Sequence, residues 1–315
     1  MDYNKSIADF TAGDEIEGFY VLKTAQAKTS NSGKPFLSAS LADRSGAIDA
    51  KMWDYNGPIS SSDEGGIVKL RGTVSEFRGS LQLIISRIRP AQDGDPCDLG
   101  RLVPVAPMDA EAAWEELMDY VRDISDEDYR AVCEAMLKKY GDRLRTIPGG
   151  KSMHHSFVNG LLMHTLYMLR TAGYLADLYD NVINRDLLMA GTLLHDFAKC
   201  DEFITSPLGL VTEYSVKGQL LGHLVMGAQE TAAAARDLGI PEEKSVLLQH
   251  MLLSHHGEPE FGAAVRPMCA EGELLSLIDL VDSRMEIYRE ALEETEVGQF
   301  SKRVFALDKK VFRHQ

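Results

Sequence analysis

The sequence predicts a two-domain protein in which a small all-β barrel is followed by an all-α domain. From residue 13 to 90, apolar and polar residues alternate, which is typical of strands with one buried face. From Met108 onward, apolar residues recur at three- and four-residue spacing, which is typical of amphipathic helices. The length of 315 residues is sufficient for two domains. We therefore expect a barrel domain at residues 1–90, a linker at 91–108 and a helical domain at 109–315.

The barrel is predicted from about five short strands that are joined by tight turns. Turn-forming residues at 31–33, 44–46 and 78–79 separate the alternating segments. Because most of these connections are short enough for hairpins, the strands are expected to pair with their neighbours in the chain. About five such strands in fewer than ~90 residues are typical of a small closed barrel.

The linker is predicted from its prolines. The stretch from Pro90 to Pro107 holds four of the eleven prolines and has no clear hydrophobic period. Seven periodic segments follow it, and each is expected to form a helix with one buried face. These segments are residues 110–124, 127–144, 157–179, 185–200, 220–239, 243–257 and 271–294.

The net charge of −15 is unevenly distributed and bears on the choice of partner. Residues 1–90 carry 11 basic and 11 acidic residues, whereas the rest of the chain carries 22 basic and 37 acidic residues. An acidic domain is a poor partner for nucleic acid unless it binds cations, which supply local positive charge. The charge therefore does not exclude a polyanionic substrate.

Neither a membrane protein nor a disulfide-stabilised protein is predicted. No stretch approaches the ~20 consecutive apolar residues that a membrane helix needs. The N-terminal residues are acidic where a signal peptide is basic, so we expect a cytoplasmic protein. The four cysteines are scattered without a CxxC pair, so we expect reduced thiols.

Histidines and aspartates within the apolar segments predict a metal site. Eight of the nine histidines lie between residues 154 and 256. A buried imidazole or carboxylate is costly unless it is paired or bound to a metal. Any one of these residues is more simply explained as a hydrogen-bonded core residue, but five such places together favour metal binding. The five places are His164, His195 with Asp196, His223, His255 with His256, and Asp279.

The order of these residues, H…HD…H…HH…D, resembles that of the HD superfamily of phosphohydrolases. The resemblance implies two divalent metal ions that share Asp196. The first would be held by His164, His195, Asp196 and Asp279. The second would be held by His223, His255 and Asp196, with His256 as a further ligand or a substrate contact. Mixed imidazole and carboxylate ligands suit Mn, Fe, Co, Ni or Zn better than Mg or Ca.

Asp196 and Lys199 are the candidate catalytic residues. Two adjacent cations, bridged by Asp196, would activate a water molecule and neutralise charge on a phosphoryl group. Lys199, in HDFAK, matches the HDxGK lysine of the superfamily, although Ala198 stands where glycine is usual. Lys199 is expected to hold a phosphate oxygen or, alternatively, to be a solvated cation at a helix end. His154 and His155 either contact the substrate phosphate or cap a helix.

The N-terminal strands resemble an OB-fold, a module that binds nucleic acids. Single-stranded nucleic acid is bound by stacking on aromatic rings and by cations that follow the backbone. The alternative is that these aromatic side chains lie in the barrel core. The candidate nucleic-acid contacts are Lys34, Phe36, Arg44, Lys51 and Trp53, with Phe77 and Arg78 as a second aromatic and basic pair.

The combination of the two domains resembles the YhaM-type 3′-5′ exoribonuclease family over nearly the whole chain. Besides the histidines and aspartates, the resemblance includes HHSFVNGLLMHTL, GQLLGHLVMG and LLSHHGEPEFG. It implies removal of nucleotides from the 3′ end of single-stranded RNA, with single-stranded DNA as a further candidate, and release of 5′-mononucleotides. It also implies manganese as the metal, and Arg266, in VRPM, is a candidate backbone contact.

Two other functions remain open on the sequence. HD domains also hydrolyse small phosphate esters such as cyclic dinucleotides, and a fold alone does not decide between substrates. The barrel favours a polymer, because a small substrate does not need a strand-binding module. A non-catalytic nucleic-acid-binding protein with a structural metal is the other possibility, and the complete ligand set argues against it.

Overall fold

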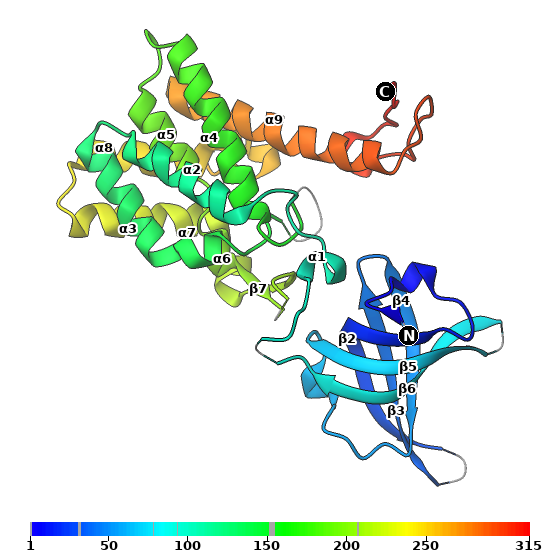
Figure 1. Ribbon diagram of the computed structural model, residues 1–315. Coiled ribbons are helices and arrows are strands. Elements are labelled where there is room, and N and C mark those ends of the chain that lie inside the picture. Colours follow the sequence, from blue (N-terminus) through cyan, green and yellow to red (C-terminus); the bar gives the residue numbers. More distant parts are fainter. Residues whose placement is uncertain (1, 31–32, 78, 93, 151–154, 207) are drawn as a thin grey trace. The chain divides into compact units, whose positions relative to one another are not determined.

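The computed structural model describes residues 2–30, 33–77, 79–92, 94–150, 155–206 and 208–315. These residues form two compact units, and the division between them falls at Val105 and Ala106, inside the segment expected to be the linker. Residues 206–209 are grouped with the first unit. A small all-β barrel and an all-α domain were predicted in this order, and both are present (Figure 1).

The first unit is a closed barrel of five strands with a short additional strand at its edge. Strand β2 is the longest and pairs with β3 through its second half and with β5 through its first half, which closes the barrel. The ring is completed by the pairs β3–β4, β4–β6 and β5–β6, of which β4–β6 is parallel. The strands are β1 (Asp2–Tyr3), β2 (Glu15–Thr29), β3 (Pro35–Asp43), β4 (Gly46–Trp53), β5 (Ile67–Phe77) and β6 (Ser80–Pro90).

The alternation in the sequence gives each barrel strand one inward face. On β3, Leu37, Ala39 and Leu41 are buried, whereas the residues between them are at least partly exposed. Strand β5 repeats the pattern, with Val68 and Leu70 inside. A period of two residues places every second side chain on the same face of a strand, so these apolar residues fill the barrel.

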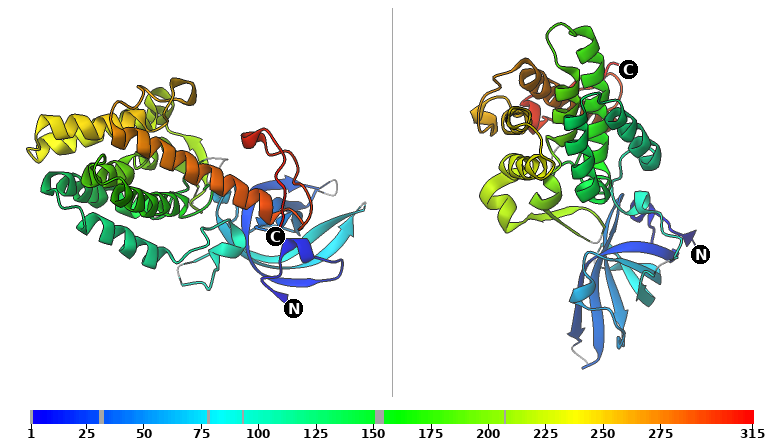
Figure 2. Two further views of the ribbon diagram at one scale, coloured as in Figure 1. Left: turned by 90° about the horizontal axis from the view of Figure 1, so that it is seen from above. Right: turned by 90° about the vertical axis from the view of Figure 1, so that its left-hand side faces the viewer.

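The second unit is a helical domain. Several of its helices begin with polar caps: Asp109, Asp126, Asn184 and Ser215 accept hydrogen bonds from the first free backbone N–H groups. Figure 2 shows α9, the longest helix at 24 residues, continuing into the C-terminal segment. The helices are α2 (Ala110–Arg122), α3 (Glu127–Leu144), α4 (Gly160–Leu178), α5 (Arg185–Leu194), α6 (Lys199–Glu202), α7 (Val216–Asp237), α8 (Glu242–Ser254) and α9 (Ala270–Glu293).

Two central helices, α4 and α5, form much of the core of this domain. All residues of α5 from Leu187 to Leu194 are buried, and so is most of α4. A helix that is apolar on nearly all sides belongs in the interior. The polar residues that these helices carry are therefore forced into the core, where they need partners.

The structure departs from the sequence prediction in two short elements. The expected linker contains a helical turn, α1 (Leu99–Leu102), which Asp98 caps. The helical domain contains an antiparallel pair of strands, β7 (Phe203–Thr205) and β8 (Val211–Tyr214). Such elements are too short to show a hydrophobic period in the sequence. No helix among the described residues is long and apolar enough to cross a membrane.

Candidate metal centre

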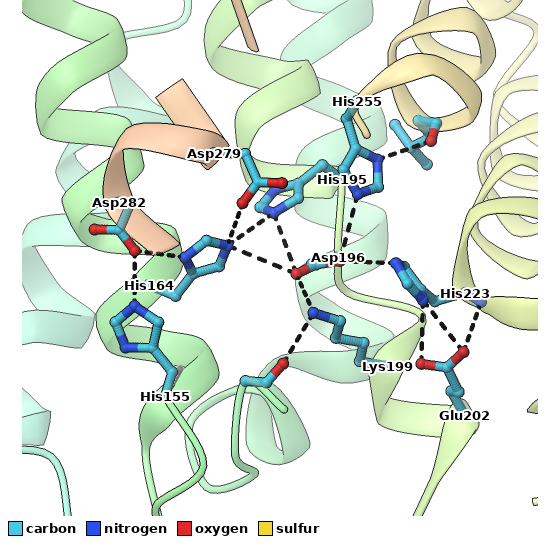
Figure 3. A network of polar contacts seen from close by, with 12 residues as sticks. His155, His164, His195, Asp196, Lys199, Glu202, His223, His255, Asp279 and Asp282 are labelled. Atoms are coloured by element: carbon cyan, nitrogen blue, oxygen red, sulfur yellow. Dashed lines mark hydrogen bonds and ion pairs between the residues drawn. The ribbon is translucent and has the colours of Figure 1, made fainter. Parts of the chain in front are cut away.

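Five helices bring the predicted metal ligands to one place (Figure 3). His164 lies within α4, His223 within α7 and Asp279 within α9. His195 and His255 are the C-terminal caps of α5 and α8, where apolar helices end. The predicted ligands that gather there are His164, His195, Asp196, His223, His255, His256 and Asp279.

The candidate ligand atoms form two sets that share Asp196. The first set lies around the Nε2 atom of His164. This atom is 3.1 Å from His195 Nε2, 3.6 Å from Asp196 Oδ2 and 3.5 Å from Asp279 Oδ1. The Nδ1 atom of His164 donates to Asp282, and Nδ1 of His195 donates to the carbonyl of Thr192 at 2.7 Å. In a neutral imidazole the other nitrogen is then a bare acceptor. The two Nε2 atoms therefore present lone pairs to the same point as the carboxylates.

The second set lies on the other side of Asp196. Its Oδ1 is 3.2 Å from His223 Nε2 and 3.7 Å from His255 Nε2. These three atoms are buried and have no hydrogen-bond partner. The Nδ1 of His255 donates to the Leu252 carbonyl, so its Nε2 carries a lone pair. The ring of His256 lies 4.4 Å from that of His255, and its Nδ1 is also buried without a partner.

These acceptor atoms fit metal ions. A buried acceptor without a partner is costly, and several that face one another repel unless a cation lies between them. Burial lowers the pKa of both His164 and His255, which favours the neutral form that binds metals. Hydrogen bonds from the outer ring nitrogen are the usual way in which a protein orients a metal-binding histidine.

Asp196 is the residue that the two sets share. Burial alone would disfavour its carboxylate, but the adjacent ammonium of Lys199 opposes burial, and the pKa of Asp196 is well below the usual range. The ammonium of Lys199 lies 2.6 Å from Asp196 Oδ2 and donates to the carbonyl of Gly149 at 2.9 Å. Lys199 is therefore part of the buried network, and not a solvated cation at a helix end.

Two supporting carboxylates were missed in the sequence. Asp282 accepts hydrogen bonds from His155 Nε2 and His164 Nδ1, both at 2.7 Å. Glu202 accepts from the backbone N–H of His223 at 3.0 Å and from its Nδ1 at 3.1 Å. The spacing of Asp279 and Asp282 offered one signal, because residues three apart lie on the same face of a helix. Glu202 stands in an acidic stretch that resembles a solvated surface.

The geometry at His223 depends on the glycine before it. Gly222 has φ 71° and ψ 160° inside α7, a conformation that is essentially restricted to glycine. Because of this break, the backbone N–H of His223 does not take part in the hydrogen bonds of the helix. It donates to Glu202 instead. The backbone and the side chain of His223 are thereby fixed by one carboxylate.

Of the two histidines considered for contact with the substrate phosphate, the structure describes His155. His155 is buried, with Nε2 held by Asp282, and it does not line the cleft over the metal centre. Its position supports the orientation of His164 and does not fit a contact with substrate. His154 lies outside the described residues.

A cleft of about 770 Å³ opens onto the two sets of metal ligands. This volume is within the usual range for a small-molecule or nucleotide pocket. Arg266 lines it, and its Nε donates to Glu258 at 2.7 Å. The cleft therefore places one of the predicted nucleic-acid contacts beside the metal ligands.

Several predicted nucleic-acid contacts gather on one side of the barrel. The rings of Phe36 and Trp53 are 5.1 Å apart, on directly paired residues of β3 and β4. The ammonium of Lys51 lies 5.7 Å from the centre of the Trp53 ring and 5.3 Å from that of Phe77. Trp53 and Phe77 are 48% and 54% exposed, so neither belongs to the barrel core.

The remaining barrel candidates are not all part of this group. Lys34 forms an exposed ion pair with Asp54, 3.4 Å apart. Arg44 lies at the turn between β3 and β4, at the opposite end of the hairpin from Trp53. Arg78 is outside the described residues.

Comparison with known proteins matches both units. The family described as "HD domain" matches residues 161–284, and the family described as "OB-fold nucleic acid binding domain" matches residues 21–91. Curated relatives named "3'-5' exoribonuclease YhaM" match almost the whole chain. The relative from Listeria monocytogenes serotype 4b is 38% identical and covers 98% of this chain and 97% of its own length. Those from Geobacillus sp. and Bacillus pumilus are 36% and 35% identical, each over 98% of this chain and over 94% and 97% of their own.

Proposed function

Since this chain belongs to the family of the 3′-5′ exoribonucleases YhaM, we propose that it removes nucleotides one at a time from the 3′ end of single-stranded RNA. The chain is a metal-dependent hydrolase with an HD domain. Single-stranded DNA is a second candidate substrate, because stacking and backbone contacts do not by themselves distinguish the two polymers.

One observation carries the two-metal form of this proposal. Asp196 directs Oδ2 to one pair of imidazole nitrogens and Oδ1 to another. Two divalent cations bound to these sets would lower the pKa of a shared water molecule and neutralise charge on the scissile phosphate. The mixed imidazole and carboxylate ligands suit manganese, with iron, cobalt, nickel and zinc as alternatives.

The chain's own residues prepare the site for hydrolysis. The ammonium of Lys199 donates hydrogen bonds to Asp196 and to the carbonyl of Gly149. It thereby fixes the position of the Asp196 carboxylate and keeps it ionised. Asp282 and Glu202 hold His164 and His223 with the Nε2 atoms directed inward. Such preorganised groups reduce the reorganisation that the reaction requires.

The products follow from the position of the cut. Water adds to the phosphorus of the last phosphodiester, and the bond between phosphorus and the 3′ oxygen of the preceding nucleotide breaks. The 3′ oxygen of the shortened RNA takes up a proton and becomes a 3′ hydroxyl, and the terminal nucleotide leaves as a 5′-monophosphate.

The barrel supports a polymeric substrate. Its exposed rings, Trp53 and Phe77, flank Lys51, and aromatic rings beside a cation are suited to single-stranded nucleic acid. Stacking of this kind depends little on sequence, as expected for an exonuclease that degrades RNA of any sequence.

The test is to incubate 5′-labelled single-stranded RNA with the protein and Mn²⁺. We expect a ladder that shortens stepwise from the 3′ end, with 5′-mononucleotides as products. If cyclic dinucleotides are turned over while the RNA stays intact, the exonuclease proposal is wrong and the small-ester alternative holds.

A further inference from the structure

Several exposed apolar side chains line the cleft over the metal centre. Phe261, which follows α8, is 76% exposed, and Leu277 and Leu280 of α9 are 48% and 46% exposed. All three line the cleft to which Asp196 and His255 also contribute. Single exposed apolar residues are ordinary, but several that line one cleft indicate a binding site.

The backbone of the loop that carries Phe261 is held in place by hydrogen bonds. Phe261 ends a 3-10 turn in which its N–H donates to the Glu258 carbonyl at 2.9 Å. The N–H of Ala264 donates to Leu253 on α8, which fastens the loop to the helix that carries His255. A Cβ atom at Gly262, where φ is 103°, would lie 3.2 Å from His256 Nδ1. The loop therefore packs directly against a histidine of the metal centre, and Phe261 stands beside it.

The charges in the cleft decide which part of a nucleotide these walls can contact. Among the described residues that line the cleft, the basic side chains are those of Lys199 and Arg266. Lys199 is bound to Asp196, and Arg266 is bound to Glu258. Glu273 adds a further negative charge to the α9 wall. Among these described residues each basic side chain already has a carboxylate partner, so the part of the wall formed by Phe261, Leu277 and Leu280 suits an uncharged, flat group.

We propose that this cleft is the subsite for the base of the 3′-terminal nucleotide, which stacks on Phe261 and packs against Leu277 and Leu280. This inference rests on the proposed exonuclease function and adds how the terminal nucleotide is held. With the last phosphodiester at the metal centre, the base reaches the apolar walls. Because every base has a π face, stacking there accepts all four bases. The subsite thus binds the 3′-terminal nucleotide without preference for its base.

The experiment compares two single-stranded RNA oligomers that differ only at the 3′ end. One ends in an ordinary nucleotide and the other in an abasic nucleotide, so the second retains the phosphodiester and loses the stacking group. For the wild-type protein with Mn²⁺, we expect kcat/KM for removal of the terminal residue to fall about 10- to 100-fold on the abasic oligomer, the effect of one stacked base.

The variant Phe261→Ala should cut the ordinary oligomer more slowly and lose its preference over the abasic oligomer. Phe261→Trp should restore the preference. The matched control is Phe305→Ala, since Phe305 is an exposed ring in the C-terminal segment that does not line the cleft, and it should behave as the wild type does. Because Phe261 is largely exposed, its replacement should leave the unfolding temperature unchanged, which a thermal melt checks.

The outcomes separate this inference from the function on which it rests. If the wild-type protein shortens neither oligomer, the proposed exonuclease function fails. If it shortens both at equal rates, or if Phe261→Ala keeps the full preference for the terminal base, the base subsite is wrong while the exonuclease function stands.

Discussion

Glu202 holds His223 at two points, accepting hydrogen bonds from its backbone N–H at 3.0 Å and from its imidazole Nδ1 at 3.1 Å. A carboxylate only accepts hydrogen bonds, so it fixes the tautomer in which Nε2 is bare. On the other side of Asp196, Asp282 likewise accepts a hydrogen bond from the Nδ1 of His164. Each set of candidate metal ligands thus has a supporting carboxylate of its own, and the two sets can be perturbed separately.

Replacing Glu202 by Gln should weaken the second metal position. The amide can direct an N–H group toward Nδ1 and favour the tautomer whose Nε2 carries a proton. Loss of such a supporting partner typically reduces metal affinity or activity by ~10- to 100-fold. Calorimetric titration with Mn²⁺ should show two equivalents for the wild type and one tight equivalent for Glu202→Gln. Glu213→Gln, an exposed change on β8, is the control. Two unchanged equivalents in Glu202→Gln would contradict the assignment.

Replacing Asp282 by Asn should affect the first metal position and the fold together. Two buried imidazoles share one carboxylate oxygen there, and they hold its pKa below the usual range even though burial opposes the charge. Hydrogen bonds to a charged group contribute ~1.5–3 kcal/mol each. We expect the free energy of unfolding of the metal-free protein to fall by about 2 kcal/mol, measured by urea denaturation. No change in stability would mean that the histidines are held by other contacts.

Replacing Asp196 by Asn should separate a catalytic centre from a structural one. The change also leaves the buried ammonium of Lys199 without its carboxylate, which is destabilising by itself. The double variant Asp196→Asn, Lys199→Met removes this complication by making the pair neutral. We expect a folded protein that binds RNA and does not cut it, as checked by circular dichroism, by fluorescence anisotropy and on the RNA ladder. Retained cleavage would exclude Asp196 from the reaction.

Replacing Trp53 by Ala should weaken binding of single-stranded RNA by about 10-fold, the usual effect of one stacking ring. The matched control is Tyr3→Ala, because Tyr3 is equally exposed at 48% and lies on the edge strand β1. Fluorescence anisotropy with a labelled oligomer measures both. Equal effects of the two substitutions would show that the group around Lys51 is not the binding surface.

Adding Mn²⁺ should raise the unfolding temperature of the wild-type protein. The ligands come from five helices, so the unfolded chain does not present them together. A ligand that binds only the folded state stabilises it by about 2.7 kcal/mol at 100 times its dissociation constant. Differential scanning fluorimetry with and without a chelator measures the shift. An unfolding temperature that is independent of the metal would argue against binding at this site.

The residues that gather at the candidate metal centre could be predicted because they interrupt apolar helices. His164, His223 and Asp279 each stand in a stretch that is otherwise buried, where an ionisable side chain needs a partner. The barrel could be predicted for a similar reason, since alternation over long strands is a strong signal. In both cases the prediction depends on the hydrophobic pattern within a single helix or strand.

The supporting residues could not be predicted in this way. Glu202 follows Asp201 in an acidic stretch, and nothing local distinguishes it from a surface residue until α7 is packed beside α6. His155 was expected either to contact the substrate phosphate or to cap a helix, but its partner Asp282 is 127 residues away in the chain. Contacts between helices determine these roles, and a single sequence does not contain them. The short strands β7 and β8 were missed because three or four residues show no period.

The break in α7 limits which substitutions position 222 can accept. A side chain at position 222 would favour a return of the backbone to the helical region, because φ 71° with ψ 160° is accessible in practice to glycine alone. The N–H of His223 would then rejoin the helix, and Glu202 would lose one of its two contacts. A mutation that touches no metal ligand would thus disable the second half of the centre. Position 222 therefore shapes the site through its backbone conformation alone, because glycine contributes no side chain to it.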